Sequence, residues 1–124
     1  MEYISHVADT PWKLERTETY KKHFRHYEKN HPNELAAVLN NLTRYMDALN
    51  AANHPRVIQA GYLHNEPAGV VAIDQRGDEG HLQATRLYTY AYLKNNTLYL
   101  LAIGNKQEQQ EDIAFCKAYV KSIK

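Results

Sequence analysis

A succession of three strand-like segments in the second half of the chain limits the folds that it can adopt. Gly69–Arg76, Leu82–Leu93 and Thr97–Ile103 are rich in β-branched, aromatic and other apolar side chains, which favour strands. Short polar turns separate these segments, at residues 77–80 and at residues 94–96. Connections this short join antiparallel neighbours, so the sequence predicts a three-stranded antiparallel meander.

Two helices are predicted before these strands. Thr17 can cap the first, which must end before Pro32 because the residue preceding a proline is disfavoured in the helical region. Its apolar side chains recur at helical spacing at Tyr20, Phe24 and Tyr27. The second helix has Asn33 as its predicted cap and a continuous apolar stripe formed by Leu35, Val38, Leu39, Leu42, Tyr45, Met46 and Leu49. A short connection predicts that the two helices pack as an antiparallel hairpin.

Shorter elements complete the predicted order. Trp12–Thr17 has the alternation of a strand, with Trp12 and Leu14 on one side. Residues 53–69 are expected to be mostly loop, with a turn at His64–Pro67. A C-terminal amphipathic helix is indicated by the apolar stripe of Ile113, Cys116, Val120 and Ile123. The order β-α-α-β-β-β-α predicts an α+β fold, a small antiparallel sheet backed by helices.

Length and composition place these elements in one domain. The chain has 124 residues, and its 15 Lys and Arg nearly balance 14 Asp and Glu, which argues against a strongly basic nucleic-acid coat. A single cysteine, Cys116, excludes an intramolecular disulfide. No apolar run approaches the roughly 20 residues of a membrane helix, and no signal peptide is recognisable. We therefore expect one soluble, cytoplasmic domain over residues 1–124, with no membrane partner.

The middle predicted strand carries a row of side chains with polar tips. Strand alternation places them on one face, at Arg86, Tyr88, Tyr90 and Tyr92. An arginine can clamp a phosphate while phenol rings stack on bases, as single-stranded RNA binding requires. The same tyrosines also suit simple packing across the sheet or beneath a helix. Both interpretations stay open for the tyrosines, whereas an arginine in a central strand favours a functional or partner contact.

The first predicted helix holds the remaining clusters of charged or metal-binding side chains. His23 and His26 lie three residues apart, but no further ligand stands at a suitable spacing, so we predict no metal site. Lys21, Lys22 and Arg25 make this helix basic. They are candidates for contacts with RNA phosphates or an acidic protein segment, or they form an ordinary solvated face.

Three motifs in this order resemble toxins of the RelE/ParE superfamily, from type II toxin–antitoxin modules. The first is Gly69–Asp74, similar to the strand that opens the family's sheet after a helical hairpin. The second is Thr85–Tyr90, similar to the family's Tyr-Arg-aliphatic-x-Tyr strand. The third is Leu100–Ile113, in which a strand runs into Gly-x-Lys-x-x-Gln-x-x-Asp-Ile and a helix. The resemblance covers roughly residues 12–123, and residues 1–11 form an extension without a clear counterpart.

The resemblance implies an activity and several site residues. Many members are endoribonucleases that cut mRNA, often on the ribosome, with no metal or other cofactor, by attack of the 2′-hydroxyl on the adjacent phosphate. Arg86 matches the family's strand arginine, which implies phosphate stabilisation. Lys106 matches the lysine after the last strand and implies a second positive charge. Gln75 and Arg76 lie at a strand end where several members carry site residues, which implies RNA contacts there, with Tyr92 as a stacking candidate.

Candidates for proton transfer are less closely tied to the family pattern. His64 and His81 are the histidines nearest the predicted sheet, and imidazole side chains suit acid–base work near neutrality. Tyr88 or Tyr90 could instead orient a group or donate a proton. A cognate antitoxin is the implied partner, through a segment that covers Arg86. The alternatives are a non-catalytic toxin that acts on DNA gyrase, and a module that binds a ligand or peptide on the tyrosine-rich sheet face.

Overall fold

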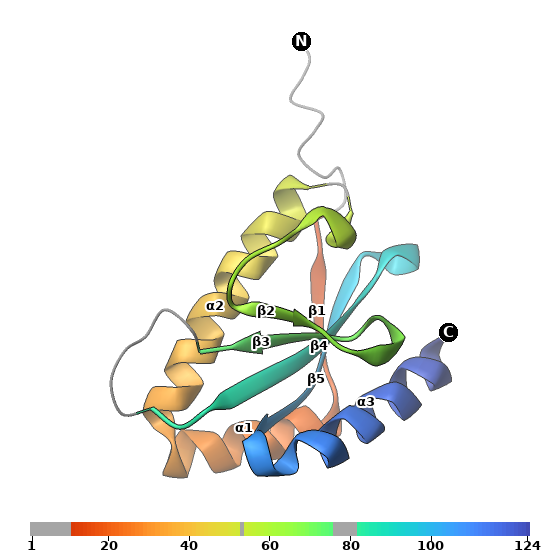
Figure 1. The fold of residues 1–124 in the computed structure, drawn as a ribbon. Coiled ribbons are helices and arrows are strands. Elements are labelled where there is room, and N and C mark those ends of the chain that lie inside the picture. The colour runs from red at the N-terminus through yellow and green to blue at the C-terminus, as the bar shows by residue number, and fades with distance from the viewer. Residues whose placement is uncertain (1–10, 53, 76–81) are drawn as a thin grey trace.

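A five-stranded sheet forms the centre of the fold in this computed structural model, which describes residues 11–52, 54–75 and 82–124. The strand order is β1-β5-β4-β3-β2 (Figure 1). Neighbouring strands are antiparallel from β2 to β5, comprising β2 (Leu63–Asn65), β3 (Val71–Asp74), β4 (Thr85–Tyr92) and β5 (Thr97–Asn105). At the other edge, β1 (Lys13–Arg16) pairs with β5 in parallel. The predicted meander is confirmed and gains β2.

Helices cover both faces of this sheet. α1 (Glu18–Asn30) and α2 (Pro32–Ala51) form the predicted hairpin and contribute to one core, while α3 (Gln109–Ile123) packs over the opposite face (Figure 1). The Thr17 hydroxyl accepts from the Tyr20 backbone N–H at 2.9 Å, which confirms the predicted cap of α1. None of the described helices is long and apolar enough to cross a membrane.

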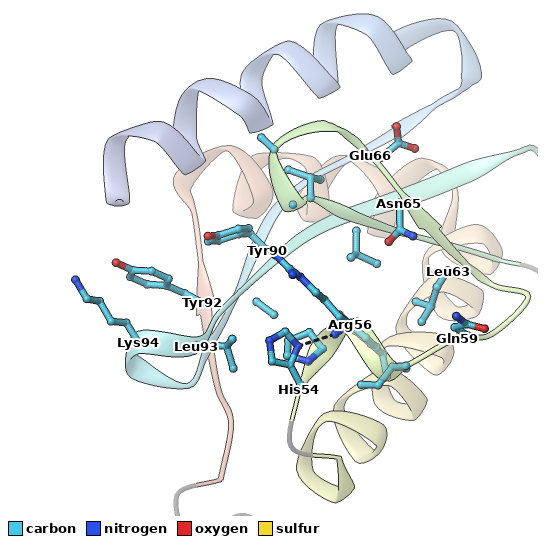
Figure 2. A pocket seen from close by; sticks show the side chains of 18 of the residues that line it. His54, Arg56, Gln59, Leu63, Asn65, Glu66, Tyr90, Tyr92, Leu93 and Lys94 are labelled. Carbon is cyan, nitrogen blue, oxygen red and sulfur yellow. Dashed lines mark hydrogen bonds between the residues drawn. The ribbon is translucent and has the colours of Figure 1, made fainter.

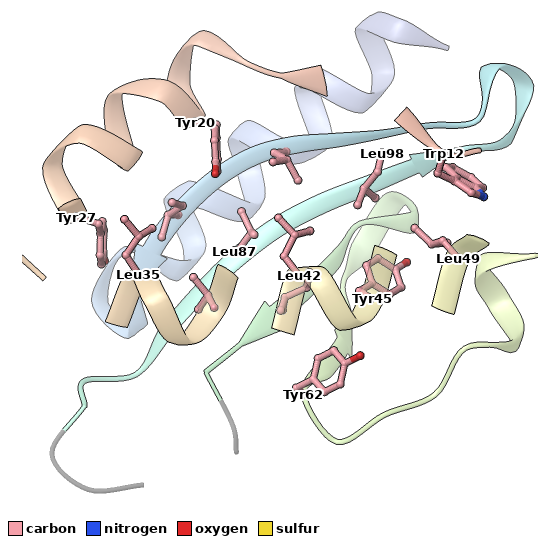
Figure 3. Packing of buried hydrophobic residues seen from close by; sticks show 14 residues of the cluster. Trp12, Tyr20, Tyr27, Leu35, Leu42, Tyr45, Leu49, Tyr62, Leu87 and Leu98 are labelled. Carbon is pink, nitrogen blue, oxygen red and sulfur yellow. The ribbon is translucent and has the colours of Figure 1, made fainter. Parts of the chain in front are cut away.

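Strand alternation divides the buried residues into two cores. On the hairpin face, Leu87 of β4 packs with Leu42 and Tyr45 of α2 and with Leu98 of β5, as Figure 3 shows. On the other face, Tyr88 packs beneath α3, whose buried residues include Cys116 and Val120, together with Val70, Ala72, Leu101 and Ala102. The sheet is therefore the middle of three layers, and each side chain of β4 faces a helix layer.

Three local predictions differ from the structure. His64 lies in β2 rather than in a turn, because Leu63–Asn65 pairs with β3. Leu14 is 48% exposed although Trp12 is buried, since β1 is an edge strand with all four residues exposed. Asn33 does not cap α2. The cap position falls on His31, and Pro32 occupies the first turn, where its missing N–H costs nothing. The predicted turn at 77–80 lies outside the described residues.

Gly104 gives a direct test of how tightly α3 sits on the sheet. A Cβ built at Gly104 would collide with the carboxylate of Asp112, which is itself buried at 8% exposure. Gly104→Ala is expected to lower the free energy of unfolding by about 1–3 kcal/mol, measured by urea denaturation, because the buried Asp112 carboxylate must shift to make room for the methyl group. Gly104→Ala combined with Asp112→Ala should recover part of this loss. Equal stability of the two variants would contradict the collision.

Candidate active site

Arg86 lies near the start of β4, between two sheet neighbours. Its register partners are Asp74 of β3 on one side and Gly104 of β5 on the other. The guanidinium Nη1 donates to Glu66 Oε2 at 3.0 Å, and the Arg86 side chain keeps 29% of its surface exposed. Arg86 is therefore a half-buried cation, held by one carboxylate and reachable from solvent.

His64 and Asp74 form a second polar pair nearby. His64 Nε2 lies 2.6 Å from Asp74 Oδ2, and the side chains are 30% and 16% exposed. A carboxylate bonded to one ring nitrogen fixes the orientation of the imidazole. Nδ1 on the other side of the ring can then exchange a proton, so the pair has the composition of a general base with its positioning acid.

The sheet register brings both pairs onto one face. Residues directly opposite each other in antiparallel strands project to the same side, and His64 pairs with Ala72. Asp74, two residues further along β3, pairs with Arg86. Together with Glu66, the side chains of His64, Asp74 and Arg86 make up what we call the Arg86 site. Two of its members, His64 and Arg86, are predicted from the sequence.

Sequence reasoning missed the two carboxylates of this site. Asp74 ends the apolar run Val70–Ile73, and a single acid at a strand end is a signal that could have pointed to it. Glu66 left no such signal, because it belongs to the segment between β2 and β3, and β2 was expected to be loop. Its partner Arg86 is 20 residues away in the chain.

The tyrosine row of β4 is largely covered rather than open. Tyr88 has no exposed surface and Tyr90 keeps 9%, because α3 packs over them. The hydroxyl of Tyr88 has no hydrogen-bond partner among the described residues, and burial, reinforced by Asp112, raises its pKa. Tyr92 is half-buried, with its ring centroid 5.9 Å from that of Tyr90. Packing beneath a helix, the second interpretation of the row, therefore describes Tyr88 and most of the Tyr90 ring, whereas Tyr92 keeps exposed surface that a base or a peptide can reach.

Asp112 is a buried acid close to this row. Burial, followed by the charges of Glu108 and Glu111, raises the pKa of Asp112 to about 7. Its Oδ2 has no hydrogen-bond partner within the described ranges. Burial, with Asp112 as the next cause, also raises the pKa of Cys116 to about 12, which leaves this thiol protonated and unreactive.

Lys106 and Gln75 flank the Arg86 site. Lys106 is exposed at the start of η5 (Lys106–Glu108), two residues after Gly104, the register partner of Arg86. The Gln75 side chain accepts from the Thr85 backbone N–H at 2.7 Å and so continues the pairing of β3 with β4. Two further predicted residues, Arg76 and His81, lie outside the described residues.

The basic helix α1 packs against β5. His23 accepts from the Ile103 backbone N–H at 3.0 Å, and burial lowers its pKa, so it is a neutral structural group. Lys21 pairs with Glu18 at 3.1 Å, while Lys22 and Arg25 are exposed and form no ion pair with another described residue. No group of three His, Cys, Asp or Glu side chains in the described part of the chain could hold a metal ion.

Comparison with known proteins gives a structural relationship and no sequence relationship. No family model matches the chain, and neither does any curated protein. The structure is similar to that of an arginine-substituted mutant of the E. coli toxin RelE in the free state, with a TM-score of 0.54 and 15% identity over 89% of this chain and 98% of that chain. It also matches the Mycobacterium tuberculosis toxin–antitoxin complex RelBE2, with a TM-score of 0.42 and 17% identity over 78% of this chain and 100% of that chain. The similarity to E. coli RelE confirms the predicted RelE-like fold.

Proposed function

We propose that this chain is the toxin of a toxin–antitoxin module and that it cleaves mRNA as a metal-independent endoribonuclease. The observation that carries the proposal is a half-exposed arginine on the same sheet face as a His–Asp pair, in a RelE-like fold. RNA cleavage by the 2′-hydroxyl requires stabilisation of a phosphate that gains charge and the movement of protons. Arg86 and His64 are chemically suited to these two tasks.

The Arg86 site can divide the reaction between its residues. His64 takes the proton of the 2′-hydroxyl as its oxygen attacks the adjacent phosphorus, and Asp74 stabilises the imidazolium that forms. Arg86 donates hydrogen bonds to the phosphate oxygens of the transition state. The bond between phosphorus and the 5′-oxygen breaks, and that oxygen receives a proton from the imidazolium or from water. The products are a 2′,3′-cyclic phosphate and a free 5′-hydroxyl.

Glu66 covers part of the Arg86 guanidinium in the absence of RNA. Its carboxylate accepts a hydrogen bond from Nη1 of Arg86 at 3.0 Å, so a phosphate must displace this carboxylate or share the donor with it. Lys106 is exposed on the adjoining turn and offers the RNA backbone a second cation. Because both contacts are electrostatic, binding of RNA should weaken as the salt concentration rises.

A cognate antitoxin is the proposed protein partner. We expect an extended or helical antitoxin segment to lie across the sheet or the helical hairpin and to cover the exposed part of Arg86. Expression of the chain alone should then arrest growth by inhibiting translation, and co-expression with the antitoxin should restore growth. Growth arrest that no neighbouring small protein relieves would contradict the toxin–antitoxin assignment.

The His–Asp pair gives a specific test of the cleavage mechanism. His64→Ala is expected to lower the rate of cleavage of a model RNA by about 100-fold, because the proton acceptor is lost. Asp74→Asn should lower it by about 10-fold or more and change the pH profile of the rate, since the imidazolium loses its charged partner. His26→Ala, an exposed histidine on α1, is the matched control. Cleavage that is equally fast in His64→Ala and His26→Ala would exclude His64 as the base.

A second candidate function is a non-catalytic toxin that acts on DNA gyrase. It is favoured by the segment Asn105–Gln109, which holds neither His nor Tyr, where the ribonuclease members of the resembled family usually carry a catalytic one. Purified protein should be incubated with RNA, with translating ribosomes and with gyrase plus plasmid DNA. Inhibition of supercoiling without RNA cleavage would favour this candidate over the first.

A further inference from the structure

A pocket of about 760 Å³ lies at the end of β4 away from Arg86. Its wall is built from the last residues of β4, the segment that follows α2 and the segment between β2 and β3 (Figure 2). This volume lies within the range of sites that hold small organic ligands. The cleavage mechanism proposed above uses none of its lining residues as an acid, a base or a phosphate-binding group.

Three cations from separate parts of the chain line the pocket. They are Arg56 in η2 (Pro55–Val57), Lys94 in η4 (Leu93–Asn95) and Lys124. None of the three forms an ion pair with another residue in the described ranges. Among the described lining residues, Glu66 has the one carboxylate side chain, and it is already paired with Arg86. The pocket therefore has an excess of positive charge, which favours an anionic ligand.

Aromatic rings lie beside these cations. The rings of Tyr90 and Tyr92 are 5.9 Å apart between centroids, and the Lys124 ammonium lies 6.0 Å from the Tyr90 centroid. Figure 2 shows the Arg56 side chain extending across the pocket toward Tyr90. Tyr92 and then Lys94 lie farther from Arg56 in the same view. Planar rings beside cations suit a ligand that combines a flat aromatic group with a negative charge.

The local backbone contributes rigidity and polar groups. His54 Nδ1 accepts from the Arg56 backbone N–H at 3.1 Å and thereby caps η2, which holds the turn that carries Arg56. The register of β3 with β4 ends at Thr89, so Tyr90–Tyr92 has no strand partner on the β3 side among the described strands. Backbone N–H and C=O groups of this segment that point away from β5 can bond the edge of a base.

We propose that this pocket binds a nucleotide, with the base against Tyr92 and the phosphate at Arg56. The same chemistry is offered by a free mononucleotide and by one nucleotide of a single-stranded RNA. The proposal does not depend on RNA cleavage. Glu66 is the one residue common to the pocket and the Arg86 site, and Glu66 has no part in the cleavage steps.

Titration of the purified protein with AMP, adenosine and inorganic phosphate tests the proposal. Changes in the NMR signals of the pocket residues, followed over increasing ligand concentration, give the dissociation constants. AMP should bind about 10-fold or more tightly than adenosine or phosphate alone, because it uses both the rings and the cations. A short single-stranded RNA distinguishes the sources. Tighter binding of the RNA than of AMP indicates a strand nucleotide, and equal or weaker binding indicates a free mononucleotide.

Variants connect the binding to the named residues. Tyr92→Leu and Arg56→Gln should each weaken AMP binding about 10-fold, whereas Tyr92→Phe should retain most of it. Lys117→Gln, which removes an exposed cation of α3 outside the pocket, is the matched control and should bind like the unchanged protein. His64→Ala, which removes the proposed base but changes no residue that lines the pocket, should also retain AMP binding, so that loss of cleavage and loss of pocket binding are separable. Absence of AMP binding at millimolar concentration, or AMP binding unaffected by Tyr92→Leu and Arg56→Gln in folded protein, would overturn the proposal.

Discussion

Arg86→Ala is expected to lower cleavage of RNA by the purified protein by about 100-fold or more, and to abolish growth arrest if toxicity rests on cleavage. The guanidinium is the one positively charged group of the Arg86 site with fixed geometry, because the sheet and Glu66 hold it in place. Preorganised donors of this kind stabilise the charge that develops on phosphate in the transition state. The measurement is the rate of cleavage of a fluorescent RNA oligonucleotide, followed by gel or fluorescence.

Two further variants separate catalysis from folding. Arg86→Ala leaves Glu66 as an unpaired carboxylate at 12% exposure, which could reduce stability for reasons unrelated to RNA. Arg86→Gln with Glu66→Gln retains a neutral hydrogen bond and should be folded but inactive. Glu66→Gln alone removes the competing carboxylate and should bind RNA more tightly. Full cleavage in the folded double variant would show that Arg86 is not part of the active site.

The stability of the protein is expected to fall as the pH rises from about 4 to 7, because of Asp112. Its pKa is raised from 3.8 to about 7 in the folded chain, so the folded state keeps a proton that the unfolded state releases. The contribution is complete below pH 3.8, declines as the pH rises and is lost above about pH 7. A shift of this size corresponds to about 4 kcal/mol at most, a large part of the stability of a small domain.

Asp112→Asn isolates this effect from other titrating groups. The variant cannot ionise, so it should gain stability relative to the unchanged protein at pH 8 and show little difference at pH 4. The measurement is the difference between the two proteins in urea denaturation at each pH. Glu111→Gln, the neighbouring exposed acid of α3, is the control and should show a much smaller pH-dependent difference. A constant difference between the Asn variant and the unchanged protein across this range would contradict the raised pKa.

The regular elements could be predicted because their signals are local. Thr17 caps α1 as predicted, and Pro32 separates the two helices of the hairpin. The alternation of β4 sends Leu87 and Tyr88 to opposite cores, as period-two patterning requires. β2 was missed because three residues with a polar centre carry too little pattern to mark a strand.

Local sequence patterns predicted the α+β class and the order of the elements except β2, since each pattern depends on neighbours within a few residues. The resemblance to a known family made Arg86 a candidate site residue. The groups that contact or adjoin Arg86 come from other strands and segments, and local patterns do not identify them. Asp74 reaches the site through the pairing of β3 with β4, and Glu66 reaches it from the segment that joins β2 to β3. Both depend on backbone hydrogen bonds between segments that are distant in the sequence. Likewise, α3 covers most of the tyrosine row of β4. The residues of a single strand do not show which helix packs over them.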